Sequence, residues 1–184
     1  APNSKDAPAY QGQVVQAYLK MGAEKEVLTE VERLRRTYGR TSSWSRANAG
    51  DADALQAAGD LIGKKLRSLA LDYHQQGRKL TGEAAASAYV LAEGAYAAYF
   101  AELPDSKYGE DMHYSYGELL YKVKKFDLAY DEYRAVVALD PKGKHAKFCA
   151  ESAVFAADEL VKREAKPAAG AAGLASSASP IASI

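Results

Sequence analysis

The chain is poor in several features that would point to particular classes of protein. One cysteine, Cys149, excludes an intramolecular disulfide, and its place among apolar residues predicts a buried thiol. No apolar run approaches the roughly 20 residues that cross a bilayer. Lys and Arg number 24, as do Asp and Glu, so no overall field attracts nucleic acid or anionic lipid. Strand-like alternation of apolar and polar residues is also scarce. These absences predict one all-α domain without a membrane span or a nucleic-acid partner.

Recognisable catalytic and cofactor motifs are missing as well. The chain has no nucleophile elbow, no HExxH and no dinucleotide fingerprint. The three histidines stand far apart, without metal-ligand spacing to one another or to Cys149. The segment from Gly59 to Lys65 faintly suggests a phosphate loop, but its glycines are too close and Lys65 stands where Ser or Thr should follow. We therefore expect no catalytic, cofactor-binding or metal-binding residues, and the chain is predicted not to be an enzyme.

What is present is a spacing of small and aromatic residues. Gly117, Ala129, Tyr133 and Pro141 stand 12, 4 and 8 residues apart. Two small residues let paired helices approach closely, a tyrosine ring fills the space beside them, and a proline marks where the second helix ends. This pattern resembles the tetratricopeptide repeat (TPR), in which two antiparallel helices form one unit and stacked units share a core.

The pattern recurs upstream. The spacing of Phe126, Ala129, Tyr133 and Pro141 is found again 37 residues earlier, at Tyr89, Ala92, Tyr96 and Pro104. This repetition predicts the second helix of another pair. Its first helix is expected over 61–76, where Leu66, Leu69, Ala70 and Tyr73 occupy the offsets of His113, Tyr116, Gly117 and Leu120. The residues 77–82 are predicted to be a connection longer than the turn at Lys124 and Lys125, which departs from the family pattern.

The remaining segments complete the expected fold. Apolar residues at helical spacing predict a first pair, from Val14, Val15, Tyr18, Val27, Val31 and Leu34. The stretch 39–51 is predicted to be a loop, and a last helix through Cys149 and Leu160 is expected to cover the end of the stack. The prediction is an all-α, TPR-type α-solenoid of three helix pairs plus a C-terminal capping helix. It assigns 1–8 to an extension, 9–164 to the solenoid and 165–184 to a tail.

The two ends leave alternatives open. The sequence starts at Ala1 without methionine, as a protein trimmed by signal peptidase would, or as an excised segment would. Alanine in first place does not support a lipoprotein anchor there. The tail is rich in Pro, Ala, Gly and Ser, which is typical of a flexible linker. A tail held along another chain is the alternative.

The predicted binding site is the groove lined by the first helices of the pairs. Residues beside the packing stripe of these helices should face it, and they are Lys64, Arg67, His74, Tyr114, Glu118, Tyr121 and Lys122. The basic residues would form a polar clamp, with the tyrosines as amphipathic anchors. Such a surface suits an extended peptide or a helix that carries acidic groups. The alternative for each residue is a solvated charge or a ring packed between helices.

A narrower resemblance rests on two loops and one helix segment. The segments that carry this resemblance are Trp44 to Asn48, Leu69 to His74, and Val136 to His145, which contains an Asp-Pro-Lys-Gly-Lys turn. The chain is similar to TPR proteins of the deltaproteobacterial cell envelope, in particular the myxobacterial adventurous-gliding-motility TPR proteins. The resemblance runs from about Tyr10 to Arg163. It implies a non-catalytic scaffold or adaptor subunit of a multiprotein envelope complex, in the periplasm or bound to the envelope, and a cytoplasmic location stays open.

Two other functions remain as alternatives. The chain could be an accessory structural subunit attached through its tail or convex face, with no groove ligand. It could also be an uncharacterised enzyme or cofactor-binding protein, which would need a cluster of titratable groups in a pocket. Partner identity and oligomeric state do not follow from the sequence.

Overall fold

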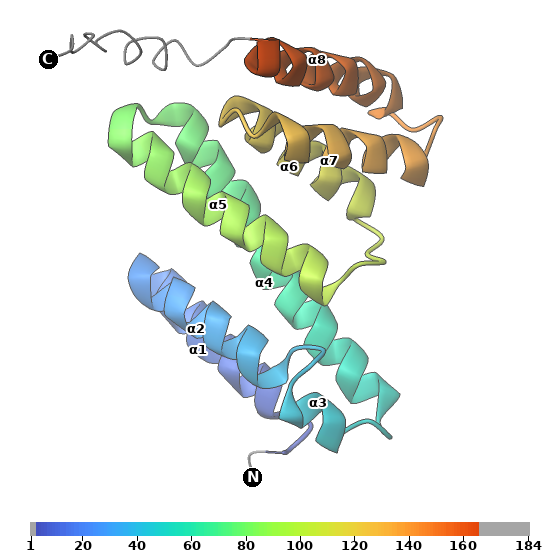
Figure 1. Ribbon diagram of the computed structural model, residues 1–184. Coiled ribbons are helices and arrows are strands. Elements are labelled where there is room, and N and C mark those ends of the chain that lie inside the picture. Colours follow the sequence, from blue (N-terminus) through green and yellow to red (C-terminus); the bar gives the residue numbers. More distant parts are fainter. Residues whose placement is uncertain (1–2, 166–184) are drawn as a thin grey trace, which may run out of the picture.

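The computed structural model describes residues 3–165, and this part of the chain is helical without strands (Figure 1). The helices are α1 (Ala7–Met21), α2 (Glu24–Tyr38), α3 (Ser43–Ala47), α4 (Ala52–Lys79), α5 (Gly82–Glu102), α6 (Gly109–Lys122), α7 (Phe126–Leu139) and α8 (Ala146–Ala165). The predicted all-α class is confirmed. The expected extension 1–8 overlaps the start of α1, and the expected tail 165–184 lies outside the described residues except for Ala165.

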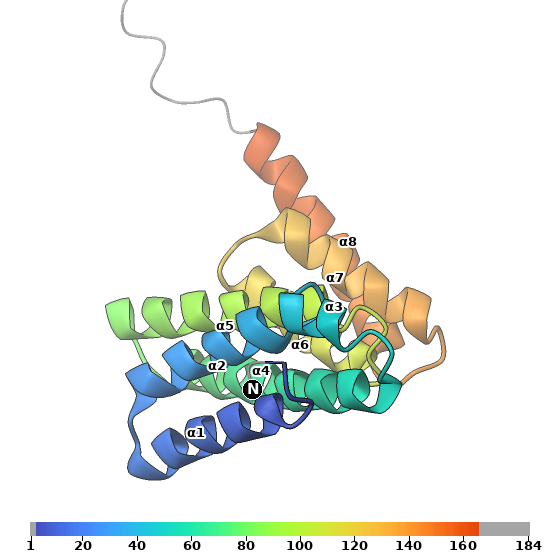
Figure 2. The same cartoon turned by 90° about the horizontal axis from the view of Figure 1, so that it is seen from below.

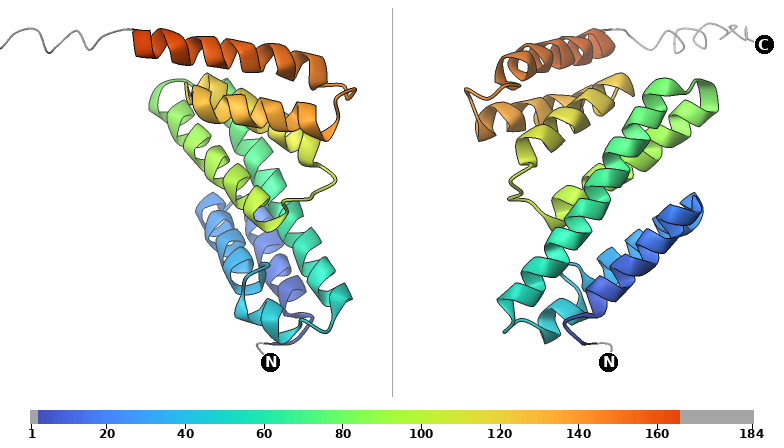
Figure 3. Two further views of the ribbon diagram at one scale, coloured as in Figure 1. Left: turned by 45° about the vertical axis from the view of Figure 1, so that its right-hand side comes forward. Right: turned by 180° about the vertical axis from the view of Figure 1, so that it is seen from behind.

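Three helical hairpins follow one another along the molecule. The helices α1 and α2, α4 and α5, and α6 and α7 pack as pairs, and α8 packs on α7. In Figure 1, α2, α5 and α7 lie toward the viewer and α1, α4 and α6 lie behind them. We call these the second-helix layer and the first-helix layer; Figure 2 shows both from below and Figure 3 from two further sides. One core cluster runs through the hairpins from Val15 to Ala153.

The first hairpin keeps its predicted core with one exception. Val15, Val27, Val31 and Leu34 are buried, whereas Val14 is exposed. Between α1 and α2 the chain turns at Gly22, whose φ of 66° is in the left-handed region that glycine adopts without strain. Pro8 lies in the first turn of α1, where its missing N–H costs no helical hydrogen bond.

The stretch 39–51, predicted to be a loop, contains α3. The side chain of Ser42 accepts a hydrogen bond from the Ser45 N–H, which satisfies one free donor at the start of this short helix. Trp44 is 2% exposed and packs with Ala54 and Ala58 of α4 in a second, smaller core cluster. The loop prediction is therefore wrong for 43–47, because Ser42 caps a helix and Trp44 gives that helix an apolar contact with α4.

The connection predicted over 77–82 is wrong. The helix α4 continues to Lys79, and two residues, Leu80 and Thr81, separate it from α5. Gly77 lies inside α4, where it serves close packing: an added Cβ would lie 2.6 Å from the ring of Tyr89 on α5. Glycine in a helix costs about 1 kcal/mol relative to alanine, and the ring contact offsets that cost. The helices α4 and α5 have 28 and 21 residues, longer than a pair within a 34-residue repeat.

The third hairpin and α8 follow the sequence prediction more closely. Gly117, Ala129 and Tyr133 are buried, and α7 ends at Leu139, before Pro141. Cys149 is fully buried, as expected. The outer side of α8 differs from that of a polar cap, because it exposes the large apolar side chains Phe148, Val154, Phe155 and Val161. None of the helices within 3–165 has both the length and the apolar character of a bilayer span.

Candidate partner-binding surface

The face shared by α4 and α6 carries most of the predicted groove residues. Arg67 of α4 stacks on Tyr108, which directly precedes α6, and Arg78 lines a pocket together with Lys122 at the other end of α6. The two helices therefore run side by side in the same direction. Along α4, spacings of three and four residues place Arg67, Leu71, His74 and Arg78 on one side of the helix. Leu71 is 41% exposed on this side.

The predicted residues do not form one clamp but divide between two pockets. Lys64 and Arg67 line a pocket of about 700 Å³ at the start of α6, here called the cationic pocket. His74, Glu118 and Lys122 line a pocket of about 330 Å³ at the end of α6, here called the histidine pocket. The groove residues Tyr114 and Tyr121 line neither.

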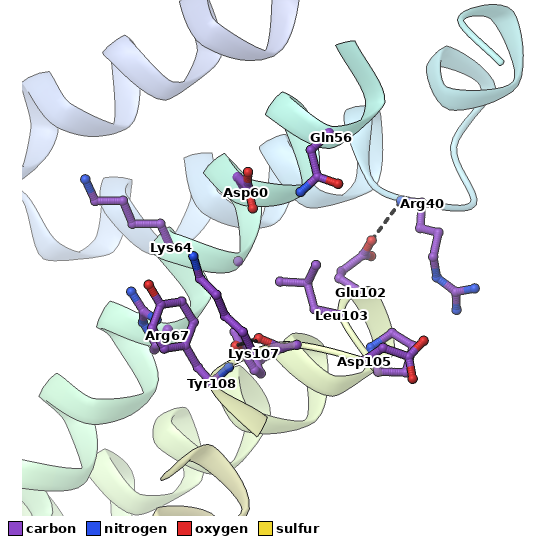
Figure 4. A pocket seen from close by; sticks show the side chains of 14 residues that line it. Arg40, Gln56, Asp60, Lys64, Arg67, Glu102, Leu103, Asp105, Lys107 and Tyr108 are labelled. Atoms are coloured by element: carbon purple, nitrogen blue, oxygen red, sulfur yellow. Dashed lines mark hydrogen bonds between the residues drawn. The ribbon is translucent and has the colours of Figure 1, made fainter. Parts of the chain in front are cut away.

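The cationic pocket is built from α4, the end of α5 and the connection between α5 and α6 (Figure 4). Its lining comprises Arg40, Gln56, Asp60, Gly63, Lys64, Arg67, Tyr99, Glu102, Leu103, Pro104, Asp105, Ser106, Lys107 and Tyr108. A Cβ on Gly63 would collide with the side chain of Leu103, so glycine lets this leucine lie close against α4. The hydroxyls of Tyr99 and Ser106 are 2.5 Å apart and tie the connection to α5. The pocket thus has a fixed apolar floor.

One carboxylate of this pocket, that of Glu102, is held by the protein itself. Glu102 accepts a hydrogen bond from the Arg40 backbone N–H at 2.8 Å and another from Arg35 at 3.3 Å. Its side chain is 9% exposed. The Arg40 guanidinium donates to the Ala101 carbonyl oxygen at 3.2 Å. These contacts join the end of α2 to the end of α5 and fix that wall.

The histidine pocket is lined by His74, Gly77, Arg78, Leu80, Ala85, Tyr89, Glu118 and Lys122. Although His74 was predicted to face an open groove, it is 9% exposed, and its Nδ1 lies 3.2 Å from the Tyr96 hydroxyl. Its ring also meets the rings of Tyr89 and Tyr96 edge-on, with centroids 6.1 Å apart in both pairs. Within the described residues the buried Tyr89 hydroxyl has no hydrogen-bond partner. Arg78 and Lys122 are exposed at the pocket's edge.

Burial of His74 makes the stability of the fold depend on pH. Desolvation, with a smaller effect from the Arg78 charge, lowers the pKa of His74 from 6.5 to about 4. The unfolded chain therefore binds this proton first as the pH falls, so this contribution to stability is complete above about pH 6.5 and lost toward about pH 4. The full shift corresponds to roughly 3 kcal/mol.

The measurement is urea unfolding between about pH 7 and pH 4 for the wild type and His74→Gln. Glutamine does not titrate in this range and can still hydrogen-bond to Tyr96. We expect the wild type to lose roughly 2–3 kcal/mol more than the variant across this interval. Equal losses would show that folding does not lower the pKa of His74.

The two predicted tyrosine anchors have different surroundings. Tyr114 is half-buried: its ring stacks on His145 with centroids 3.9 Å apart and meets Phe148 of α8 edge-on at 5.8 Å. This aromatic group extends the surface from α6 to α8. Tyr121 lies edge-on to Phe126 at 5.2 Å and packs against the core. Its position agrees with the alternative of a ring packed between helices.

Some residues of this surface were not predicted. Lys107 and Tyr108 lie in the irregular connection before α6, where no helical spacing predicts which way a side chain points. Phe148 was assigned to the capping helix and not to the groove. Arg78 fell in the connection wrongly predicted at 77–82. The spacing of three and four residues along α4 could have identified Arg78, because it lies four residues after His74 and so on the same side of the helix.

The metal, thiol and phosphate-loop candidates of the sequence can be placed within the described residues. No group of three or more His, Cys, Asp or Glu within 3–165 is placed to hold a metal ion. Burial raises the pKa of the Cys149 thiol to about 11, which disfavours the reactive thiolate. The segment 59–65, which faintly suggested a phosphate loop, is part of α4.

No protein-family model, curated protein or solved structure matches the chain.

Proposed function

We propose that the chain is a non-catalytic protein-binding scaffold of the TPR type, which binds its partner on the first-helix layer. The observation that carries this proposal is the parallel course of α4 and α6, with a pocket at each end of their shared face. Exposed cations and the exposed Leu71 lie along the same side. Apolar anchors surrounded by charged residues are typical of surfaces that bind peptides.

The third hairpin gives the best support for a TPR unit. An added Cβ on Gly117 would lie 2.9 Å from the Tyr133 ring, which agrees with a small residue where two helices approach. The second hairpin has the same small and aromatic positions, with Ala70 and Tyr96 buried, but its helices are longer. We therefore interpret it as a lengthened unit. The resemblance to envelope TPR proteins supports a role as an adaptor subunit of a periplasmic or envelope complex.

One observation favours the alternative of attachment by another surface. Val154, Phe155 and Val161 of α8 are between 60% and 67% exposed. Large exposed apolar side chains on one helix are unusual for a surface that faces water alone. In this alternative, α8 or the residues after it would hold the chain in a complex, and the first-helix layer would carry no ligand.

Affinity capture from the membranes of the producing cells distinguishes these functions. We expect the Arg78→Glu/Lys122→Glu variant to recover about tenfold less partner than wild type, because it reverses two charges on the shared face of α4 and α6. The control is Lys25→Glu/Arg36→Glu, which makes the same charge change at exposed positions on α2, away from this face and from α8. Equal recovery by both variants and wild type would contradict binding on this face and favour attachment elsewhere.

A further inference from the structure

Three cations of the cationic pocket are free of carboxylate partners. Lys64 and Arg67 project from α4, and Lys107 projects from the connection before α6 (Figure 4). Within the described part of the chain none of the three is in an ion pair. The Arg40 guanidinium, across the pocket, instead donates to the Ala101 carbonyl oxygen. Positive charge is therefore concentrated on one side of a pocket in a chain of no net charge.

Tyr108 organises these cations. The Arg67 guanidinium lies 3.6 Å from the centroid of its ring, and the Lys107 ammonium lies 5.2 Å from it. These contacts hold Arg67 in place and keep Lys107 beside it. Hydrogen bonding from Arg67 and the charge of Lys107 lower the pKa of the Tyr108 phenol, as expected where positive charge collects.

The charge of the whole pocket limits which anion fits. Its lining holds four cations, Arg40, Lys64, Arg67 and Lys107, and three carboxylates, Asp60, Glu102 and Asp105, which leaves a net charge of +1. A single carboxylate balances this charge. A phosphate ester, with a charge of about −1.5 to −2 at neutral pH, exceeds it, and Asp60 and Asp105 would repel it more strongly than they repel a single carboxylate.

The floor of the pocket adds a second requirement. Leu103 lies against Gly63 and Tyr99 next to the cations, and its side chain is incompletely buried. An apolar group in contact with Leu103 would remove this surface from water, which a free inorganic anion cannot do. A ligand with one carboxylate and one neighbouring apolar group satisfies both parts of the site.

We propose that the cationic pocket binds a segment of a protein partner in which an acidic side chain lies next to an apolar one. The carboxylate sits between Lys64, Arg67 and Lys107, and the apolar side chain covers Leu103. This inference rests on the proposed function, because it names the chemistry of the partner. The site is formed by α4 together with the connection between α5 and α6, which supplies Lys107 and Tyr108.

The test is an NMR titration of the ¹⁵N-labelled chain with capped peptides that carry one Glu-Leu pair between glycines, here the Glu peptide, or one Gln-Leu pair between glycines, here the Gln peptide. Inorganic phosphate and acetate serve as free anions. We expect the Glu peptide to shift the amide signals of Gly63, Leu103 and Tyr108, and the Gln peptide and both free anions to bind at least about tenfold more weakly. In Lys64→Gln/Lys107→Gln the Glu peptide should bind about 4- to 25-fold more weakly, since each exposed pair contributes about 2- to 5-fold.

Two controls protect this result. Lys147→Gln makes the same change at an exposed residue of α8 and should bind the Glu peptide like wild type. Because Lys64 and Lys107 are exposed, their substitution is not expected to disturb folding, which unchanged amide signals outside the pocket would verify. Equal binding of Glu and Gln peptides, or full binding by Lys64→Gln/Lys107→Gln, overturns the proposal. Phosphate binding as tight as that of the Glu peptide overturns the assignment of a carboxylate.

Capture experiments separate failure of this inference from failure of the proposed function. If Lys64→Gln/Lys107→Gln recovers every partner and Arg78→Glu/Lys122→Glu recovers none, the scaffold function holds and the cationic pocket is not its anchor. If wild type recovers no partner, the scaffold function itself fails. Loss of the partner in both variants, together with selective Glu-peptide binding, supports both.

Discussion

Replacing Trp44 with alanine is expected to lower the free energy of unfolding by about 3–5 kcal/mol. The ring is 2% exposed and packs against Ala54 and Ala58 of α4. It also meets Tyr38 edge-on, with centroids 5.6 Å apart, and its Nε1–H donates to the Ser4 carbonyl oxygen at 2.9 Å. Truncation leaves a cavity that two alanines cannot fill and removes the contact joining the N-terminal residues to α3 and α4.

Thermal unfolding followed by circular dichroism measures this effect. For a chain of this length, about 3–5 kcal/mol corresponds to a fall in Tm of about 6–20 °C. Trp44→Phe is the matched control, because phenylalanine keeps a ring against Tyr38 but loses the N–H donor. It should be destabilised much less than the alanine variant. If Trp44→Ala melts like wild type, the second core cluster does not contribute to the cooperative fold.

The sequence predicted correctly those parts of the fold in which the helical spacing of apolar residues matches the side that packs against other helices. Val15, Leu34, Tyr96 and Tyr133 are buried as expected, because an apolar stripe of period 3.6 must face the neighbouring helices. The third hairpin was predicted best, since its glycine, alanine, tyrosine and proline all occupy positions that the packing requires.

The errors arose where one residue type serves two purposes. Gly77 was assigned to a connection, but it lies in α4, and the ring of Tyr89 occupies the space that a side chain would need. Ser42 and Ser43 were interpreted as loop residues, although Ser42 caps α3. Local propensity cannot distinguish a glycine that ends a helix from one that admits a neighbour, since the neighbour is distant in sequence.

The placement of the candidate surface residues could be predicted in part, for a related reason. The periodicity of α4 and α6 places Lys64, Arg67, Glu118 and Lys122 on their shared face, and all four line pockets there. It could not show that His74 is covered by Tyr89 and Tyr96, because this depends on how α5 crosses α4. Nor could it place Lys107, whose position depends on an irregular connection.

Replacing Gly117 with valine is expected to destabilise the fold by about 1–3 kcal/mol. An added Cβ would lie 2.9 Å from the Cδ1 and Cε1 atoms of Tyr133, closer than carbon atoms can approach without displacement. Tyr133 is 1% exposed, and its hydroxyl donates to Glu118 at 2.6 Å, so the ring has little room to move. Overpacking should outweigh the few tenths of a kcal/mol by which valine is the better helix former.

Gly94 of α5 provides the matched control, because it is also a helical glycine but has no atom within 4 Å of an added Cβ. Gly94→Ala should therefore stabilise the protein by about 0.5–1 kcal/mol through helix propensity alone. Urea unfolding of both variants should give changes of opposite sign. If Gly117→Val is as stable as wild type, the close contact with Tyr133 is wrong, and the TPR register of the third hairpin fails with it. If Gly94→Ala is destabilised, the space around this position is not open, and Gly94 is not a valid control.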